Sequence, residues 1–132
     1  MIFIDANVPM YIIGAEHPHK TDAQHVIGRV TTARERLVTD AEVLQEILHR
    51  YISIKRRDAI QPAFDLLQAL VDEIFPVDAA AVELAKTMVL GYPKLSARDA
   101  IHAATMQQHQ VERIVSFDAG FDVLPGIIRI SG

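Results

Sequence analysis

The sequence predicts an α/β protein with a mainly parallel central sheet, in one domain over residues 1–132. Short runs of residues typical of strands occur at 2–4, 37–39 and 113–117, and the first has no polar residue, as in strands buried on both faces. Helical apolar spacing fills the segments between them. Strands that alternate with helices of about 10 to 15 residues are typical of βαβ units.

The first strand ends at Asp5, and a short helix is expected over residues 10–13, with Asn7 as a suitable N-cap. Residues 16–20 are expected to form a loop. From Ala23 onward, apolar residues recur with the spacing of an amphipathic helix that runs to about residue 34.

The second strand leads into a helix whose start matches the capping-box pattern Thr39-x-x-Glu42. A further helix is expected to begin at or near Pro62. Residues 74–77 favour an edge strand, because Pro76 cannot donate a hydrogen bond to a neighbouring strand. The apolar face of the helix after the second strand is expected to comprise Val43, Leu44, Ile47, Leu48, Tyr51 and Ile52.

The last third of the chain predicts two more helices and one or two strands. Asp78 is the expected cap of a helix that runs to residue 90, and Ser96 is the expected cap of a helix that runs to about residue 109. The strand over residues 113–117 follows, and residues 127–130 are a candidate for one more.

The composition excludes several classes of site. The chain has no cysteine, which excludes disulfides, thiolate metal sites and cysteine nucleophiles. A net charge of −4 argues against a general polyanion binder, so a nucleic-acid partner would need a local basic patch or bound cations. Asp5 comes too early for a signal peptide, and no uncharged stretch is long and apolar enough to cross a bilayer. We therefore expect a cytoplasmic protein.

Four carboxylates stand where this scheme lets them converge. Asp5 and Asp118 each end a predicted strand, Asp99 lies in the first turn of a helix, and Glu46 lies in the second turn of another. In a parallel α/β sheet, the carboxyl ends of the strands face the crevice where ligands bind. The N-termini of the following helices lie at the same edge, so one edge of the sheet can collect all four acids.

Taken singly, three of these acids have a structural explanation. Asp99 fits the acidic partner of a helix cap, and Asp118 fits a turn. Glu46 fits an ion pair with Arg50, which would contribute only about 0.3–0.5 kcal/mol. Asp5 is harder to explain in this way, because an acid that closes a buried strand needs a partner.

Taken together, the acids predict a metal site. At about 5 Å and an effective dielectric of about 20, each pair of like charges costs roughly 3 kcal/mol. Four carboxylates therefore need a cation or raised pKa values to lie close together. Oxygen ligands without cysteine indicate Mg²⁺ or Mn²⁺. Two such ions about 3.5–4 Å apart would clamp the reacting oxygens of a phosphodiester displacement.

Other polar residues near the strand ends are candidate supporting groups. Ser116 and Asn7 could orient a carboxylate or a bound water, although Asn7 is also explained as an N-cap. Asp122 is a fifth acid and is expected at the periphery. His102 is either a hydrogen-bond donor behind the acids or, as the sequence favours, a histidine on the helix surface.

The densest basic cluster follows the helix that carries Glu46. Its positive charges could track the phosphates of a nucleic acid. A solvated helix end explains the same run and is favoured by its pattern alone. The cluster comprises Arg50, Lys55, Arg56 and Arg57.

Four pieces of sequence occur in a fixed order: Ile4-Asp5-Ala6-Asn7, Val43-Leu44-Gln45-Glu46-Ile47, Ser96-Ala97-Arg98-Asp99-Ala100-Ile101-His102-Ala103-Ala104 and Ser116-Phe117-Asp118-Ala119-Gly120-Phe121-Asp122. In this order and spacing they resemble the PIN-domain nucleases, and most closely the VapC-type toxins of bacterial or archaeal toxin–antitoxin pairs. The resemblance covers nearly the whole chain, from residue 2 to about residue 130.

The resemblance implies a three-layer α/β/α sandwich with the first strand central, and a Mg²⁺- or Mn²⁺-dependent endoribonuclease. Asp5, Glu46, Asp99 and Asp118 match the acidic quartet of the family, and Ser116 matches its small hydroxyl residue. Members commonly form homodimers and are neutralised by an antitoxin whose tail covers the acidic cleft. Glu42 lies one helical turn before Glu46 and is the competing candidate for the second acid.

Two functions therefore remain open at the level of sequence. The first is hydrolysis of RNA by a metal-activated water, with Asp5, Asp99 and Asp118 holding the metal and Glu46 binding a second ion or orienting the water. The second is a catalytically inactive PIN-like module that binds RNA or protein. A phosphatase with Asp5 as nucleophile is less favoured, because Asn7 stands where an Asp-x-Asp motif needs its second acid.

Overall fold

The computed structural model describes residues 1–132. Strands and helices alternate along the chain as expected. In order they are β1 Ile2–Ile4, α1 Asn7–Ile13, α2 Pro18–Thr32, β2 Leu37–Asp40, α3 Ala41–Ser53, η1 Arg57–Ala59, α4 Ile60–Leu70, β3 Glu73–Phe75, α5 Ala79–Gly91, α6 Ala97–Gln108, β4 Arg113–Val115, η2 Ala119–Val123 and β5 Ile128–Ile130.

The five strands form one parallel sheet in the order β3-β2-β1-β4-β5. In the central strand β1, Phe3 lies opposite Val38 of β2 and Ile114 of β4. All three residues of β1 are buried, which explains why this segment carries no polar residue. The predicted central position of the first strand and the edge position of β3 are confirmed.

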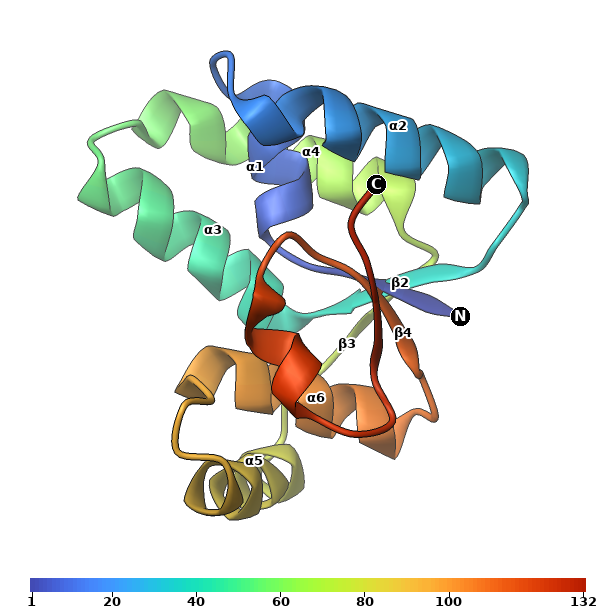
Figure 1. Cartoon of the computed structure of the whole chain (residues 1–132). Helices are drawn as coiled ribbons and strands as arrows, with labels where there is room; N and C mark the ends of the chain where they lie inside the picture. Colours follow the sequence, from blue (N-terminus) through green and yellow to red (C-terminus); the bar gives the residue numbers. More distant parts are fainter.

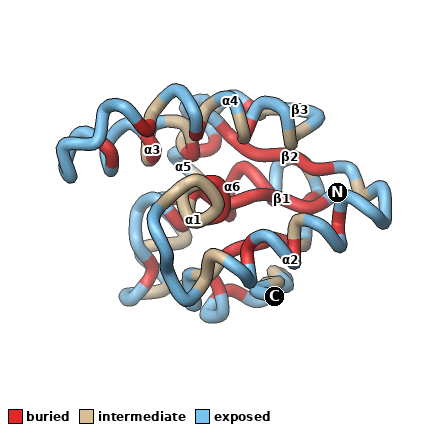
Figure 2. Tube along the Cα trace, turned by 90° about the horizontal axis from the view of Figure 1, so that it is seen from above, coloured by how far each residue is buried: buried red, intermediate tan, exposed pale blue.

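Helices cover both faces of the sheet (Figure 1). Helices α1 to α4 lie on one face, and α5 and α6 lie on the other. The trace in Figure 2 is buried along the central strands and at the inward turns of the helices, and exposed on their outer turns. The predicted three-layer α/β/α sandwich is therefore confirmed. No helix of the chain combines the length and the apolar character needed to cross a membrane.

Side-chain caps begin four of the α-helices, and serine or aspartate supplies three of these caps. Ser96 accepts a hydrogen bond from the backbone of Asp99, and Asp78 accepts one from Ala81, as the sequence predicts. The predicted capping box at Thr39 is wrong, because Asp40 is the N-cap of α3 and accepts from the backbone of Val43 at 3.0 Å. The hydroxyl of Thr39 instead donates to the carbonyl oxygen of Ile4.

Several boundaries differ from the sequence-based expectation. Helix α1 begins at Asn7 rather than near residue 10, and Asn7 does not cap it. Helix α2 begins at Pro18, inside the expected loop, because a proline is tolerated in the first turn and the ring of His17 caps the helix. Strand β4 ends at Val115, before the chain turns towards the site.

The buried face of α3 is narrower than its apolar stripe. Val43, Ile47 and Tyr51 are buried, one turn apart along the helix. Leu48 and Ile52, expected on the same face, are 39% and 45% exposed. Each lies one residue, or about 100°, around the helix from the buried row, which turns it out of the core.

Candidate active site

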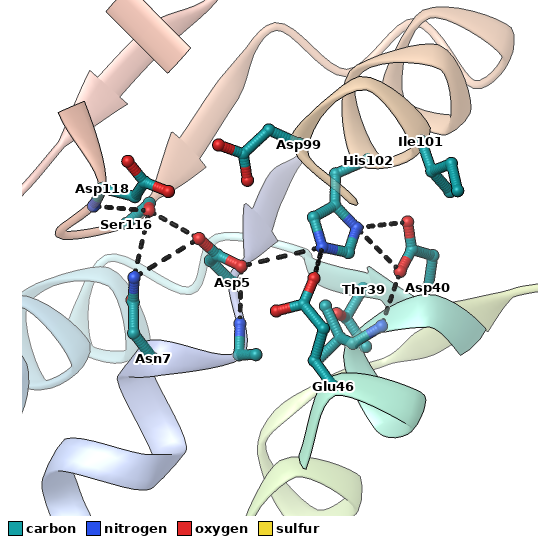
Figure 3. A network of polar contacts seen from close by, with 12 residues as sticks. Asp5, Asn7, Thr39, Asp40, Glu46, Asp99, Ile101, His102, Ser116 and Asp118 are labelled. Atoms are coloured by element: carbon teal, nitrogen blue, oxygen red, sulfur yellow. Dashed lines mark hydrogen bonds and ion pairs between the residues drawn. The ribbon is translucent and has the colours of Figure 1, made fainter. Parts of the chain in front are cut away.

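Four elements bring the predicted acids to one place (Figure 3). Asp5 follows β1 and Asp118 follows β4, while Glu46 projects from α3 and Asp99 from the first turn of α6. Glu46, Asp99 and Asp118 line a cavity of about 340 Å³, together with the exposed Arg98. The carboxyl ends of neighbouring parallel strands thus collect acids that lie far apart in the sequence.

A serine connects two of these acids. The hydroxyl of Ser116 donates to Oδ2 of Asp5 at 2.6 Å and accepts from the backbone N–H of Asp118 at 3.0 Å. The other carboxylate oxygen of Asp5 accepts from the backbone of Ala6 at 2.7 Å. Ser116 therefore fixes the orientation of Asp5 relative to the loop that carries Asp118.

Asn7 belongs to the same network. Its side-chain nitrogen lies 3.4 Å from both Oδ2 of Asp5 and the hydroxyl of Ser116. Its side-chain oxygen accepts from the backbone of Phe117 at 3.4 Å. The side chain of Asn7 therefore joins the ends of β1 and β4, and the N-cap explanation for it is wrong.

His102 is the polar residue that the sequence placed incorrectly. Its side chain is fully buried, not on the helix surface. Nδ1 lies 2.8 Å from Oδ2 of Asp40, and Nε2 lies 2.6 Å from Oε1 of Glu46 and 3.8 Å from Oδ1 of Asp5. Helix α6 packs between the sheet and α5, so most of its faces are buried. The alanines that surround His102 in the sequence were the signal for this.

The carboxylates around His102 change its charge. Burial by itself lowers the pKa of the imidazole, but hydrogen bonds and charge from Asp40 and Glu46 outweigh it and raise the pKa well above the ordinary value. The ring is therefore a cation held among acids. Asp40, which the sequence analysis did not single out, is fully buried and acts both as the cap of α3 and as the partner of this ring.

Two acids of the site have raised pKa values. Burial raises the pKa of Asp5, against the opposing effects of His102 and of the Ser116 hydrogen bond. Burial and then the neighbouring Asp118 carboxylate raise the pKa of Asp99 to about 8. The site therefore lacks positive charge for its number of carboxylates, and a divalent cation would supply it.

The backbone of η2 accommodates two carboxylates at close range. The N–H of Gly120 donates to Oδ1 of Asp118 at 2.8 Å. A Cβ atom at this position would lie 2.9 Å from Oδ2 of Asp99 and 3.0 Å from Oδ1 of Asp118. Glycine is therefore the residue that leaves room for both acids.

The donor atoms present suit a divalent metal ion. One ligand atom each from Asp5, Glu46 and His102 can be chosen so that all lie within 4.8 Å of one another. Of these, the carboxylate oxygens are ligands that Mg²⁺ and Mn²⁺ prefer, whereas the protonated ring of His102 uses both nitrogens for hydrogen bonds and has no lone pair to offer an ion. Glu46 hydrogen-bonds to His102 and lines the cavity, whereas Glu42 does neither.

Asp122 lies outside this constellation. Its two carboxylate oxygens accept from Arg129 at 2.9 and 3.0 Å, and its side chain is about half exposed. It makes no hydrogen bond to the other acids of the site. Asp122 therefore forms an ion pair that links η2 to β5.

The basic cluster lies beside the acidic site and is exposed. Arg50 and Arg56 line a cavity of about 470 Å³ that extends to Asn7. The guanidinium of Arg56 is already engaged, with two hydrogen bonds to Asp58. Arg50, Lys55 and Arg57 make no ion pair within the protein, and Arg50 does not form the predicted pair with Glu46.

Comparison with known proteins gives consistent matches over the whole chain. The model of the PIN domain family matches residues 2–127. A VapC ribonuclease of Mycobacterium bovis and ribonuclease VapC13 of Mycobacterium tuberculosis are each 56% identical over 131 residues, which cover 99% of this chain and 100% of theirs.

Solved structures share the fold at low sequence identity. The crystal structure of Mycobacterium tuberculosis VapC20, described as a sarcin–ricin loop cleaving toxin, has a TM-score of 0.82 and 20% identity, with 100% of both chains covered. A toxin–antitoxin complex from Klebsiella pneumoniae has a TM-score of 0.69 and 16% identity, with 97% of this chain and 96% of that chain covered.

Proposed function

We propose, since this chain belongs to the PIN-domain family and within it to the VapC ribonucleases, that it is a metal-dependent endoribonuclease and the toxin of a toxin–antitoxin pair. The observation that carries the proposal is that Glu46, Asp99 and Asp118 line one cavity with the buried Asp5 beside them, and that the pKa values of Asp5 and Asp99 are raised. Such groups are candidates for a catalytic site.

The residues that would hold a divalent ion are Asp5, Asp99 and Asp118, with Glu46 close enough to contribute. Their donor atoms suit Mg²⁺ or Mn²⁺. The raised pKa values of Asp5 and Asp99 mean that their ionised forms are disfavoured, and a bound cation would stabilise those forms. A bound ion supplies the charge that lowers the pKa of a neighbouring water and offsets charge on the reacting phosphate.

The protein groups around the acids have separate tasks. Ser116 holds Asp5 in one orientation through the 2.6 Å hydrogen bond. One oxygen of Glu46 is engaged by His102, and the other makes no hydrogen bond within the protein. That free oxygen is suited to orient an attacking water and to accept its proton. The products would be two RNA fragments, since water adds to phosphorus and the ester oxygen leaves.

Positive side chains near the acids are suited to hold the RNA backbone. Arg98 lines the same cavity as Asp99 and makes no ion pair, so its guanidinium is available to a phosphate. Arg50, Lys55 and Arg57 are exposed and unpaired at the end of α3. Together they would offset the repulsion between RNA and a chain of net charge −4.

The test is cleavage of a panel of purified RNAs with Mg²⁺, with Mn²⁺ and with a chelator. We expect cleavage only with metal, and no cleavage by Asp5→Asn. Glu83→Gln, which removes an exposed acid of α5, is the matched control and should cleave normally. A folded wild-type protein that binds RNA but cleaves none of the panel with either ion would favour the inactive binding module instead.

The proposal includes protein partners. A solved structure of similar fold is a toxin–antitoxin complex, which supports an antitoxin as partner. We also propose a homodimer, because the apolar side chains Leu48, Ile52 and Leu90 are 39%, 45% and 78% exposed. Sedimentation equilibrium of the wild type and of Leu90→Lys tests this. We expect the activity in the cytoplasm, where RNA and antitoxin would be met.

A further inference from the structure

Four rings form a cluster beside the candidate active site. The ring of Tyr11 stacks on His17 with centroids 4.4 Å apart and planes 23° apart, and Phe117 stacks on His19 at 4.8 Å and 28°. The two stacks meet where Tyr11 and Phe117 lie edge to face at 5.6 Å. We call these four residues, Tyr11, His17, His19 and Phe117, the aromatic platform.

The platform is connected directly to the acidic site. Phe117 stands between Ser116 and Asp118 in the chain, and its backbone N–H donates to the side chain of Asn7. Tyr11 and His17 line the cavity of about 470 Å³ that also contains Asn7. A strand of RNA that reached the acids past Asn7 would cross the cavity that Tyr11 and His17 line.

The platform is accessible, although Phe117 also packs against the hydrophobic core. His17 is exposed, the side chain of His19 is 43% exposed, and Tyr11 and Phe117 are half-buried. One face of the His17 ring rests on Tyr11, and the ring of His19 lies tilted by 34° with its centroid 5.3 Å away. Arg50 and Arg56 line the same cavity, so positive charge lies close to these flat surfaces.

We propose that the aromatic platform is a subsite for the bases of an unpaired stretch of RNA next to the cleaved phosphate. The proposal rests on the proposed ribonuclease function and assigns a base-binding subsite to four residues outside the acidic cluster. Bases in a duplex stack on one another, whereas unpaired bases can stack on protein rings. One such stack typically changes affinity by roughly 5- to 150-fold. The enzyme would therefore select single strands and loops over duplexes.

His17 allows a sharp test, because its ring and its capping role can be separated. Nδ1 of His17 accepts a hydrogen bond from the backbone of His19 and so caps α2. His17→Asn keeps a good capping group and removes the ring, whereas His17→Phe keeps a ring and removes the cap. His25→Asn, an exposed histidine within the same helix, is the matched control.

The probes are a fluorescein-labelled RNA decamer without self-complementarity, an abasic oligonucleotide of the same length, and a hairpin duplex. Affinity is measured by fluorescence anisotropy in a chelator, where cleavage is stopped. We expect the wild type to prefer the decamer to both other probes. His17→Asn should lose roughly tenfold in affinity for the decamer and nothing for the abasic probe, and His17→Phe should bind like the wild type.

Two outcomes would overturn the proposal. One is equal affinity of the wild type for the decamer and the abasic probe. The other is an equal loss by His17→Asn on both probes, which would assign the ring to structure or charge. Wild-type cleavage of RNA is assayed separately with Mg²⁺. These results would therefore exclude the aromatic platform as a base-binding subsite without contradicting the proposed ribonuclease function. Absence of cleavage by the wild type with Mg²⁺ would instead contradict the proposed ribonuclease function.

Discussion

Nε2 of His102 lies 2.6 Å from Oε1 of Glu46, although the two residues are 56 positions apart in the chain. The other nitrogen of the same ring lies 2.8 Å from Asp40, which ends β2 and caps α3. One fully buried ring thus ties α6 to two points on the segment that carries Glu46. The position of Glu46 depends on this ring as well as on its own helix.

Asp40→Asn tests that dependence. Asparagine also caps helices well, so α3 should keep its start, while the charge that pairs with His102 is lost. We expect the free energy of unfolding to fall by about 1–3 kcal/mol, because a buried charged partner is removed. We expect the rate of RNA cleavage to fall about 10- to 100-fold, as for partners that orient metal ligands. Urea denaturation and cleavage rates measure the two effects.

Asp78→Asn is the matched control, since Asp78 caps α5 in the same way and has no part in the site. It should leave cleavage unchanged. If Asp40→Asn and Asp78→Asn behave alike, the pairing between Asp40 and His102 has no functional role, and only the cap matters.

The sequence was sufficient for the fold because local signals agree with the packing. The apolar run Ile2–Ile4 predicts the central strand, and the caps Asp78 and Ser96 stand where the structure has them. Asp5 and Asp118 could be placed together because strand ends meet at one edge of a parallel sheet. Each of these conclusions needs only a short segment and a general rule of topology.

The sequence-based predictions that proved wrong concern features that depend on tertiary packing. His102 has the same local pattern whether its helix face is buried or exposed, so only the position of α6 against the sheet decides its role. The outward turn of Leu48 and Ile52 depends on how α3 lies across the sheet edge. The contact between Tyr11 and Phe117 joins segments that no periodicity relates.

Asp99→Asn should separate stability from activity. The pKa of Asp99 is raised to about 8 by burial and then by Asp118, so the ionised form is disfavoured without a cation. We expect Asp99→Asn to be more stable than the wild type in a chelator at about pH 8, and by a smaller margin at about pH 5, where Asp99 is protonated in the folded state. Cleavage should be lost at both. Greater stability of the wild type at pH 8 without metal would contradict this account.

The same pKa shifts predict a pH dependence of the wild type. Asp5, Asp99 and His102 all have raised pKa values, so the folded state binds more protons than the unfolded state. The stability that this extra protonation contributes is fully present at low pH; for Asp99 it is lost as pH rises from about 3.8 through about 8, and for His102 the loss begins above about 6.5. In a chelator, the melting temperature should therefore fall between about pH 5 and about pH 8.

Added Mg²⁺ should reverse that trend. A cation competes with protons for these carboxylates, so its affinity should rise over the same pH range. The increase in melting temperature on adding Mg²⁺ should accordingly grow with pH. A Mg²⁺ effect that is independent of pH would mean that the ion binds elsewhere.

Gly120→Ala should weaken metal binding. The added methyl group would lie 2.9 Å from Oδ2 of Asp99 and 3.0 Å from Oδ1 of Asp118, so at least one carboxylate must move. We expect half-maximal cleavage to require a roughly tenfold higher Mg²⁺ concentration, with a modest change in stability. Titration of cleavage with Mg²⁺ measures this. Gly28→Ala is the control, since nothing lies within 4 Å of a Cβ atom there, and it should bind the ion like the wild type.

The unpaired basic residues should set the salt dependence of RNA binding. Reversing both Arg50 and Lys55 to Glu removes two cations that make no ion pair in the protein. If both contact phosphates, the slope of log affinity against log salt should become shallower by about 1.4, or about 0.7 for each contact with a single strand. Arg36→Glu, at a distant ion pair with Glu73, is the control. An unchanged slope would exclude the basic cluster from the RNA path.

Gln110→Gly should stabilise the protein without touching the site. Gln110 follows α6 with φ of 58°, in the left-handed region that favours glycine. The backbone there closes the helix, since the N–H of Val111 donates to the carbonyl of Met106 at 2.9 Å. Glycine removes the strain of a side chain in this conformation, so we expect a gain of about 0.5–1 kcal/mol in the free energy of unfolding. Gln110→Ala should give no such gain, because alanine is strained at the same φ. Cleavage should be unchanged in both variants, and a gain of equal size for alanine would show that the glutamine side chain, not the backbone conformation, is the destabilising element.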